Sequence, residues 1–302
     1  MFSYWIPITI FATFMQNLRS ALQKYIKGKL STGGAAYVRF LYALPLALIL
    51  LWTLVTQFGY ELPGINPTFL IYCVLGSLTQ ILFTFILLYL FSLRNFAVGT
   101  TFSKTEIVQI AILGLILLGD EISLMGVGAI VVGMTGVIIL SMAQTAVTWG
   151  NLATSLFEKS TLVGLLCGAF LGASVVFFRG ATLSLEDGDV IIRASFSLAV
   201  ALVMQTVMMG AYLLLREPGQ MALVFRHWRP ASAVGLAGFL GSMGWFTAFT
   251  LQNAAYVRAV GQIELIFTFI ASIMFFKEKT SPTELAGIAL IMTAIVAIVL
   301  SA

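Results

Sequence analysis

Charge is scarce in this sequence. Only 9% of its 302 residues are charged, whereas 60% are hydrophobic, and a soluble domain carries roughly 25% charged residues. The chain therefore lacks the polar surface that a water-soluble domain needs on all sides. Apolar runs of about 20 residues recur along its length, as transmembrane helices require. The composition indicates an all-α polytopic membrane protein.

Histidine and cysteine are almost absent. His227 is the single histidine, and Cys73 and Cys167 both fall inside apolar runs, so neither a disulfide framework nor a metal site is expected. The sequence also lacks a phosphate-binding glycine-rich loop and a nucleophile elbow. We therefore expect no cofactor, no metal and no ATP-driven transport. The net charge of +4 comes from cations in short loops, which indicates membrane orientation and not nucleic-acid binding.

Ten membrane-spanning helices are expected from the apolar runs. Their ranges are 4–24, 32–56, 67–92, 96–118, 122–142, 161–182, 190–215, 231–251, 254–276 and 282–301. Residues 143–160 are too polar to span a membrane and are interpreted as a linker. The basic and aromatic stretch 216–230 is interpreted as a surface segment at the lipid headgroups. The last span is expected to begin at Ser281-Pro282-Thr283-Glu284, which resembles a helix start.

The two halves of the chain resemble each other. The stretches 95–123 and 253–281 align without gaps, and this alignment pairs Glu106 with Glu264 and Ser123 with Ser281. Upstream, Arg39 and Arg193 stand near the starts of corresponding helices. We infer an internal duplication, with one five-helix repeat in 1–142 and a second in 161–302. Because five is odd, the second repeat is expected to be inverted, with a binding site between the repeats near the bilayer midplane.

The doubled motif resembles the EamA-like ten-helix branch of the drug/metabolite transporter superfamily over nearly the whole chain. In each half the motif is a glutamate, an apolar run and then an acid at a turn: Glu106 with Asp120-Glu121, and Glu264 with Glu278. Relatives often carry proline after the first glutamate, where Ile107 and Leu265 stand here. The resemblance implies a non-enzymatic transporter that exports amino acids, metabolites or drugs.

Glu106 and Glu264 are the first candidates for a functional site. A carboxylate inside an apolar span costs a few kcal/mol on insertion scales and marks a functional site by default. Burial favours the protonated form of a carboxyl group, so either acid could exchange a proton with a gradient. The alternative is a structural role, in which a buried ion pair or hydrogen bond holds a broken helix.

Several other polar residues are candidates for substrate binding. Arg39 and Arg193 could pair with the two acids or bind a substrate anion, or they could extend toward headgroups. Lys104 and Gln262 stand two residues before the acids, on another face of the helix, so Lys104 is expected to reach another helix or the cavity. The remaining candidates are Arg258, interpreted as a cavity entrance or an interfacial anchor, and Gln16, Asn17 and Trp245, interpreted as cavity wall or packing.

These observations favour a secondary transporter, as an exporter of a small metabolite or drug by alternating access, with proton coupling left open. One alternative is an uncoupled exchanger of anionic metabolites such as sugar phosphates or nucleotide sugars, and another is a membrane-embedded lipid-modifying enzyme. The expected partners are a small-molecule substrate and membrane lipids. Lys and Arg gather in alternate loops, which places both termini on the outer face of a bacterial inner membrane. Monomer and homodimer both stay open.

Overall fold

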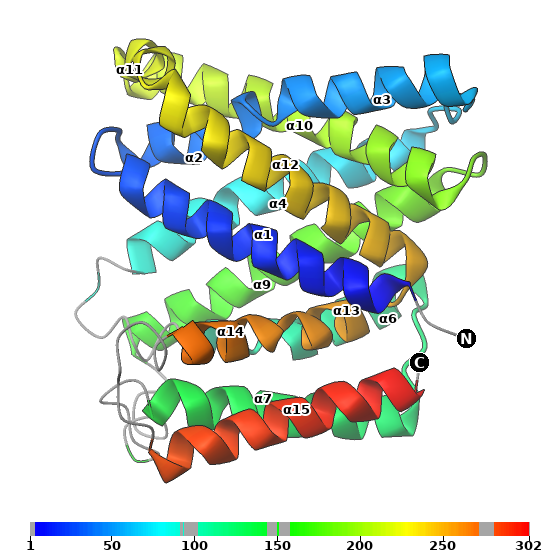
Figure 1. The fold of residues 1–302 in the computed structure, drawn as a ribbon, viewed down its shortest axis with the longest axis vertical. Coiled ribbons are helices and arrows are strands. Elements are labelled where there is room, and N and C mark those ends of the chain that lie inside the picture. Colours follow the sequence, from blue (N-terminus) through cyan, green and yellow to red (C-terminus); the bar gives the residue numbers. More distant parts are fainter. Residues whose placement is uncertain are drawn as a thin grey trace. The chain divides into compact units, whose positions relative to one another are not determined.

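The computed structural model describes residues 4–90, 93, 102–143, 150, 158–271 and 281–301, and every regular element in these ranges is a helix (Figure 1). The helices are α1 (Trp5–Ile26), α2 (Thr32–Leu41), α3 (Leu44–Phe58), α4 (Pro67–Leu90), α6 (Glu106–Leu118), α7 (Leu124–Ala143), α9 (Lys159–Ser184), α10 (Val190–Arg216), α11 (Gln220–Arg226), α12 (Trp228–Leu251), α13 (Ala254–Gly261), α14 (Ile263–Ala271) and α15 (Pro282–Ser301). Most of the predicted linker, and the turn that holds Glu278, lie outside the described residues.

The predicted all-α class is confirmed, and the chain is a multi-pass integral membrane protein. Among the described residues, six helical segments are long and apolar enough to cross a membrane. They are Thr32–Phe58, Pro67–Leu87, Lys159–Ser184, Val190–Arg216, Trp228–Leu251 and Pro282–Leu300, and two shorter apolar helices cover Glu106–Leu118 and Leu124–Leu140. The count of ten spans stays a prediction.

Helix bounds repeat along the chain at the spacing that separates Glu106 from Glu264, which is 264 − 106 = 158 residues. Shifted by this spacing, the α2–α3 segment 32–58 falls on 190–216, the bounds of α10, and α7 at 124–143 falls on 282–301, the bounds of α15. These two pairs of segments have the same bounds at this spacing, whereas α4, shifted to 225–248, differs by three residues from the bounds of α12. This agreement supports the inferred duplication.

At this spacing of 158 residues, Arg39 and Arg193 do not fall on each other. Arg39 lies in the last turn of α2, whereas Arg193 lies near the start of α10. The residue at the position equivalent to Arg39 is Ser197, which is buried. At this spacing the two arginines are one helical turn out of register, although both stand in corresponding helices.

The chain divides into two compact units, each built from both halves of the sequence. The first unit comprises Met1–Ile81 and Phe177–Gln252, and the second comprises Leu82–Val176 and Asn253–Ala302. These units group residues that lie close together in space. They are a different division from the predicted sequence repeats, which stay a prediction.

Small residues bring α1 and α12 together in the first unit, where the two helices lie side by side (Figure 1). A Cβ atom on Gly244 would come within 2.8 Å of the Ala12 Cβ, and one on Gly241 within 3.4 Å of the Gln16 backbone nitrogen. In the same unit, Phe69 of α4 stacks on Phe196 of α10 with ring centroids 5.5 Å apart. Close backbone approach at small residues is the usual way in which helices associate within a membrane.

In the second unit, α7 packs along α15 (Figure 1). A Cβ atom on Gly136 would lie 2.8 Å from the Gly287 carbonyl oxygen. Helix α15 begins as predicted, at a capping box: the Ser281 backbone N–H donates to the Glu284 carboxylate at 2.8 Å, and the Glu284 N–H donates to the Ser281 hydroxyl at 3.2 Å. These caps satisfy backbone groups that a helix end leaves without intrahelical partners.

Replacing Gly136 by Ala is expected to destabilise the protein by about 1–3 kcal/mol, because the added methyl group forces two backbones apart. Gly128, on the same helix, has nothing within 4 Å of its Cβ position. The matched change Gly128→Ala is therefore expected to be neutral or to stabilise by up to about 1 kcal/mol. Unfolding of the purified protein in detergent measures both, and equal effects would contradict the close α7–α15 approach.

Candidate functional site

Each of the two carboxylates stands at the start of a helix. Glu106 is the first residue of α6, and a turn at Lys104 and Thr105 precedes it. Glu264 is the second residue of α14, which is separated from α13 by Gln262. Two carboxylates predicted inside continuous spans thus lie at helix breaks, although neither site has the proline of relatives. The positive N-terminal end of a helix stabilises such a carboxylate.

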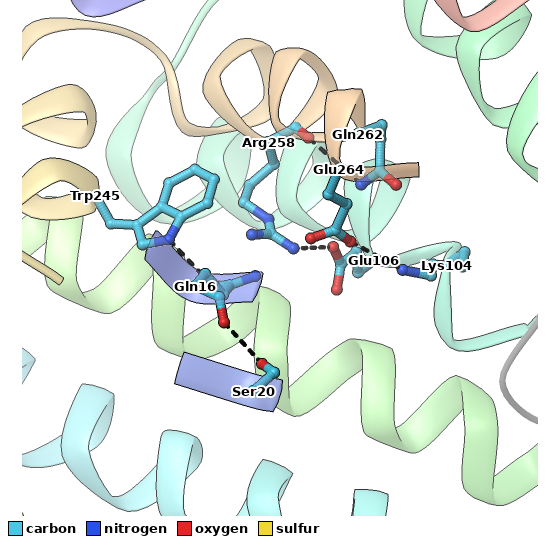
Figure 2. Close-up of polar contacts among 8 residues, drawn as sticks. All are labelled: Gln16, Ser20, Lys104, Glu106, Trp245, Arg258, Gln262 and Glu264. Atoms are coloured by element: carbon cyan, nitrogen blue, oxygen red, sulfur yellow. Dashed lines mark hydrogen bonds and ion pairs between the residues drawn. The ribbon is translucent and has the colours of Figure 1, made fainter. Parts of the chain in front are cut away.

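Glu106 forms a buried ion pair with Arg258 of α13 (Figure 2). The Arg258 Nη2 donates to Glu106 Oε1, and the two side chains are only 7% and 4% exposed. A charge-assisted hydrogen bond in apolar surroundings is among the stronger polar contacts in proteins. Arg258 is therefore not the interfacial anchor that the sequence left open, because its guanidinium is buried against a carboxylate.

Glu264 pairs with Lys104, and the two side chains are more accessible than those of the first pair. The Lys104 Nζ lies 3.3 Å from Glu264 Oε1, with side-chain exposures of 28% and 15%. The expectation that Lys104 reaches another helix is confirmed. The pairing is crossed, since each acid takes its cation from the other half of the sequence (Figure 2).

The acids follow the repeat, but their cations do not. Shifted by 158 residues, Lys104 falls on Gln262 and Arg258 falls on Thr100. Gln262 is 3% exposed, and its Nε2 donates to the Arg258 carbonyl oxygen at 3.4 Å. Its Oε1 is buried with no hydrogen-bond partner among the described residues. The charge arrangement is therefore asymmetric around two symmetric carboxylates.

Two glycines of α9 pack against α6 beside this cluster. A Cβ atom on Gly168 would lie 2.8 Å from the Ser103 carbonyl oxygen and 3.5 Å from the Glu106 backbone nitrogen, and one on Gly172 would lie 3.1 Å from Ile110 Cγ1. At these two positions α9 therefore packs closely within the chain. The close approach leaves no room for a larger residue next to Glu106.

The polar side chains of α1, which include the candidates Gln16 and Asn17, lie partly inside the first unit. Gln16 Oε1 accepts a hydrogen bond from Trp245 Nε1 at 3.0 Å (Figure 2), and Gln23 Nε2 donates to the Ala35 carbonyl oxygen at 3.0 Å. Trp245 also stacks on Phe249, with ring centroids 5.5 Å apart. Asn17 is half-buried, and Ser20 is exposed. Gln16 and Trp245 are thus held by packing within their unit.

A small polar cavity lies in the first unit. Its polar walls are Arg39 of α2, Gln80 of α4, Gln205 of α10 and Ser242 of α12, and its apolar walls are Phe40, Leu198, Ala201, Leu202 and Phe246. Gln205 Nε2 donates to Gln80 Oε1 at 2.5 Å. Sequence reasoning missed Gln80, Gln205 and Ser242, although a polar residue in the middle of an apolar helix is a signal that could have found them.

Arg193 lies outside this cavity wall. Its Nη1 donates to the Leu185 carbonyl oxygen at 3.5 Å, a bond to the backbone that precedes its own helix. The predicted pairing of Arg39 and Arg193 with the carboxylates is replaced, within the second unit, by Arg258 and Lys104. Neither arginine belongs to the unit that contains the acids. No three His, Cys, Asp or Glu side chains gather as metal ligands in the described part of the chain.

Comparison with known proteins gives one family and one fold. Residues 159–300 match the model of a family described as the EamA-like transporter family. No curated protein matches the chain. A chain of known crystal structure, described only as a protein, superimposes with a TM-score of 0.74 at 14% sequence identity, and the match covers 100% of both chains. At that identity the likeness shows the fold alone.

Proposed function

We propose that this chain, whose residues 159–300 match the model of the EamA-like transporter family, is a transporter that exports a small metabolite or drug by proton-coupled alternating access. The family is typically non-enzymatic. The proposal includes ten spans in two inverted repeats, in a bacterial inner membrane with both termini outside. The shared helix bounds at a spacing of 158 residues support the repeats, and the Lys and Arg distribution supports the orientation.

The observation that carries proton coupling is the contrast between the two ion pairs. Arg258–Glu106 is buried and hydrogen-bonded, whereas Lys104–Glu264 is longer and more accessible. An acid that exchanges a proton must first part from its cation, and an accessible pair separates at lower cost than a buried one. Glu264 is therefore the proton-exchanging acid, while Glu106 keeps α13 fixed to α6.

In the proposed cycle the Glu264 carboxyl group alternates between an ion pair with Lys104 and a bound proton. As a carboxylate it pairs with Lys104, and as a carboxylic acid it releases Lys104 and carries one proton taken from water. Release of Lys104 loosens α14 from the turn before α6, and this is a movement at a broken helix of the kind that transporters use for gating. In the opposite half-cycle Glu264 releases the proton to water on the cytoplasmic side and pairs with Lys104 again, so proton entry drives substrate export.

An uncoupled exchanger of anionic metabolites is the second candidate. The observation that favours it is the arginine-lined cavity of the first unit, whose walls contain no acid. In that mechanism both ion pairs stay closed through the cycle. A pH gradient would then leave the rate of substrate movement unchanged.

Proteoliposomes with a trapped pH-sensitive dye separate these candidates. Purified protein is first screened by thermal shift against amino acids, organic acids, sugar phosphates and cationic drugs, because a ligand that binds the folded state raises the unfolding temperature. Each stabilising compound is then tested for transport. We expect a compound-dependent change of lumen pH and faster movement with an imposed gradient. Movement without any pH response indicates the exchanger, and no movement of any stabilising compound overturns the transporter proposal.

A further inference from the structure

The cavity of the first unit contains a cation that its own walls do not balance. Arg39 is half-buried there, and none of the residues that line the cavity is acidic. Within the described residues the guanidinium makes no ion pair and no hydrogen bond, and its one aromatic contact is with the neighbouring Phe40 ring, 4.9 Å from the ring centroid. A buried charge is costly unless a partner compensates it. The missing negative charge points to an occupant.

Helix α1 also approaches this part of the first unit. Arg19 of α1 lies in the surroundings of Arg39. A Cβ atom on Gly238 of α12 would lie 3.5 Å from Arg19 Cδ and 3.6 Å from the Arg39 backbone carbonyl oxygen, so α1 and α2 both come close to α12 there.

The other walls have the chemistry of an anion site with an apolar extension. The Ser242 hydroxyl makes no hydrogen bond to another described residue, so its proton is available to a ligand oxygen. Gln80, Gln205 and Ser242 stand near the middles of their helices. Phe40, Leu198 and Phe246 complete the wall. An arginine fork fits the planar oxygens of a carboxylate or the oxygens of a phosphate.

We propose that this cavity binds the anionic group, a carboxylate or a phosphate, of a small organic substrate whose remainder is apolar. Arg39 and Ser242 contact the anionic oxygens, and the leucine and phenylalanine side chains contact the apolar part. The inference rests on the proposed transport function and names the substrate class. The cavity has a volume of about 10 Å³, room for roughly one water molecule, so the substrate enters when the helices part during the transport cycle.

A matched series of phenyl compounds tests the proposal in the purified full chain. Benzoate and phenyl phosphate carry the anionic groups, benzamide is neutral and benzylamine is a cation, and all share one apolar ring. Binding is measured by thermal shift and by titration calorimetry. We expect one or both anions to bind at least about tenfold more tightly than benzamide and benzylamine, as a charge-assisted hydrogen bond provides. The benzoate and phenyl phosphate arms decide which head group the site prefers.

Variants assign the binding to this cavity. Arg39→Gln is expected to remove the preference for anions, Arg39→Lys to keep part of it, and the control Arg216→Gln, an exposed arginine on α10, to keep all of it. Gln205→Glu supplies an internal carboxylate beside Arg39. This change is expected to raise the unfolding temperature of the ligand-free protein and to abolish anion binding, which tests the site even if Arg39→Gln fails to fold.

Two results overturn the inference: equal or tighter binding of benzylamine, or anion binding that survives both Arg39→Gln and Gln205→Glu. Failure of the transport proposal looks different. In that case the anions bind and depend on Arg39, but no anion moves across the proteoliposome membrane. If instead a neutral or cationic compound is transported at the same rate by wild type and Arg39→Gln, transport stands and this inference is wrong.

Discussion

Replacing Arg258 by Gln is expected to lower the free energy of unfolding by about 3–5 kcal/mol, because it leaves the Glu106 carboxylate charged, buried and without its cation. Glu106 is 4% exposed on its side chain, so water cannot replace the lost partner. The change also frees α13 from α6 at the point where the two helices are joined. Chemical unfolding of the purified protein in detergent measures the loss.

The double variant Glu106→Gln, Arg258→Gln separates this cause from a general packing defect. With both charges removed, most of the stability is expected to return, since a buried pair contributes little net stability over neutral residues of similar size. Lys104→Gln is a matched comparison at the accessible pair and is expected to cost less than about 1 kcal/mol. A double variant as unstable as Arg258→Gln alone would contradict the assignment of the loss to an uncompensated charge.

The largest effect on transport is expected for Glu264→Gln, which should abolish the whole gradient-dependent part of substrate movement. Glutamine resembles the protonated acid in shape and neutrality but cannot release a proton, so the variant stays in one half of the coupled cycle. Proteoliposomes loaded with a stabilising compound and a pH-sensitive dye measure substrate and proton movement together. Exchange of substrate without a gradient is expected to continue.

The control for this variant is Glu121→Gln, which changes an exposed acid at the turn after α6 and is expected to keep gradient-driven movement. Stability should differ little between the two, since Lys104 is accessible enough to be hydrated when Glu264 is neutral. Gradient-driven movement that persists in Glu264→Gln at the wild-type rate would remove Glu264 from the coupling mechanism.

Apolar composition predicts the helices well because each span must satisfy its backbone hydrogen bonds within itself. The bounds of α15 agree with the predicted 282–301, and those of α10 differ by one residue from the predicted 190–215. The breaks at Gln262 and between α2 and α3 were not predicted. The break between α2 and α3 directly precedes Pro45, at the second position of α3, and a proline there cannot continue the hydrogen bonds of the preceding helix. The break at Gln262 has no proline in the adjoining helices, and such a break depends on which neighbouring helices pack there.

The acids could be found from sequence, but their partners could not. Charge inside apolar runs identifies Glu106 and Glu264 as candidates. Helix geometry predicts that Lys104 points away from the acid on its own helix. The interpretation of Arg258 as a cavity entrance or an interfacial anchor considers only its own helix. In the structure the carboxylate that pairs with Arg258 is that of Glu106, on another helix. Pairing between distant segments depends on tertiary packing, which the spacing of residues within one helix does not encode.

The crossed pairs also set how membrane voltage acts on this part of the protein. Glu106, Glu264, Lys104 and Arg258 carry two negative and two positive charges, so as paired they add no net charge. A proton on Glu264 raises that sum by one. Moving one elementary charge across a membrane potential of 100 mV changes the free energy by about 2.3 kcal/mol. The membrane voltage therefore acts on the cluster when Glu264 is protonated. When both ion pairs are formed, the cluster carries no net charge and the voltage exerts no net force on it.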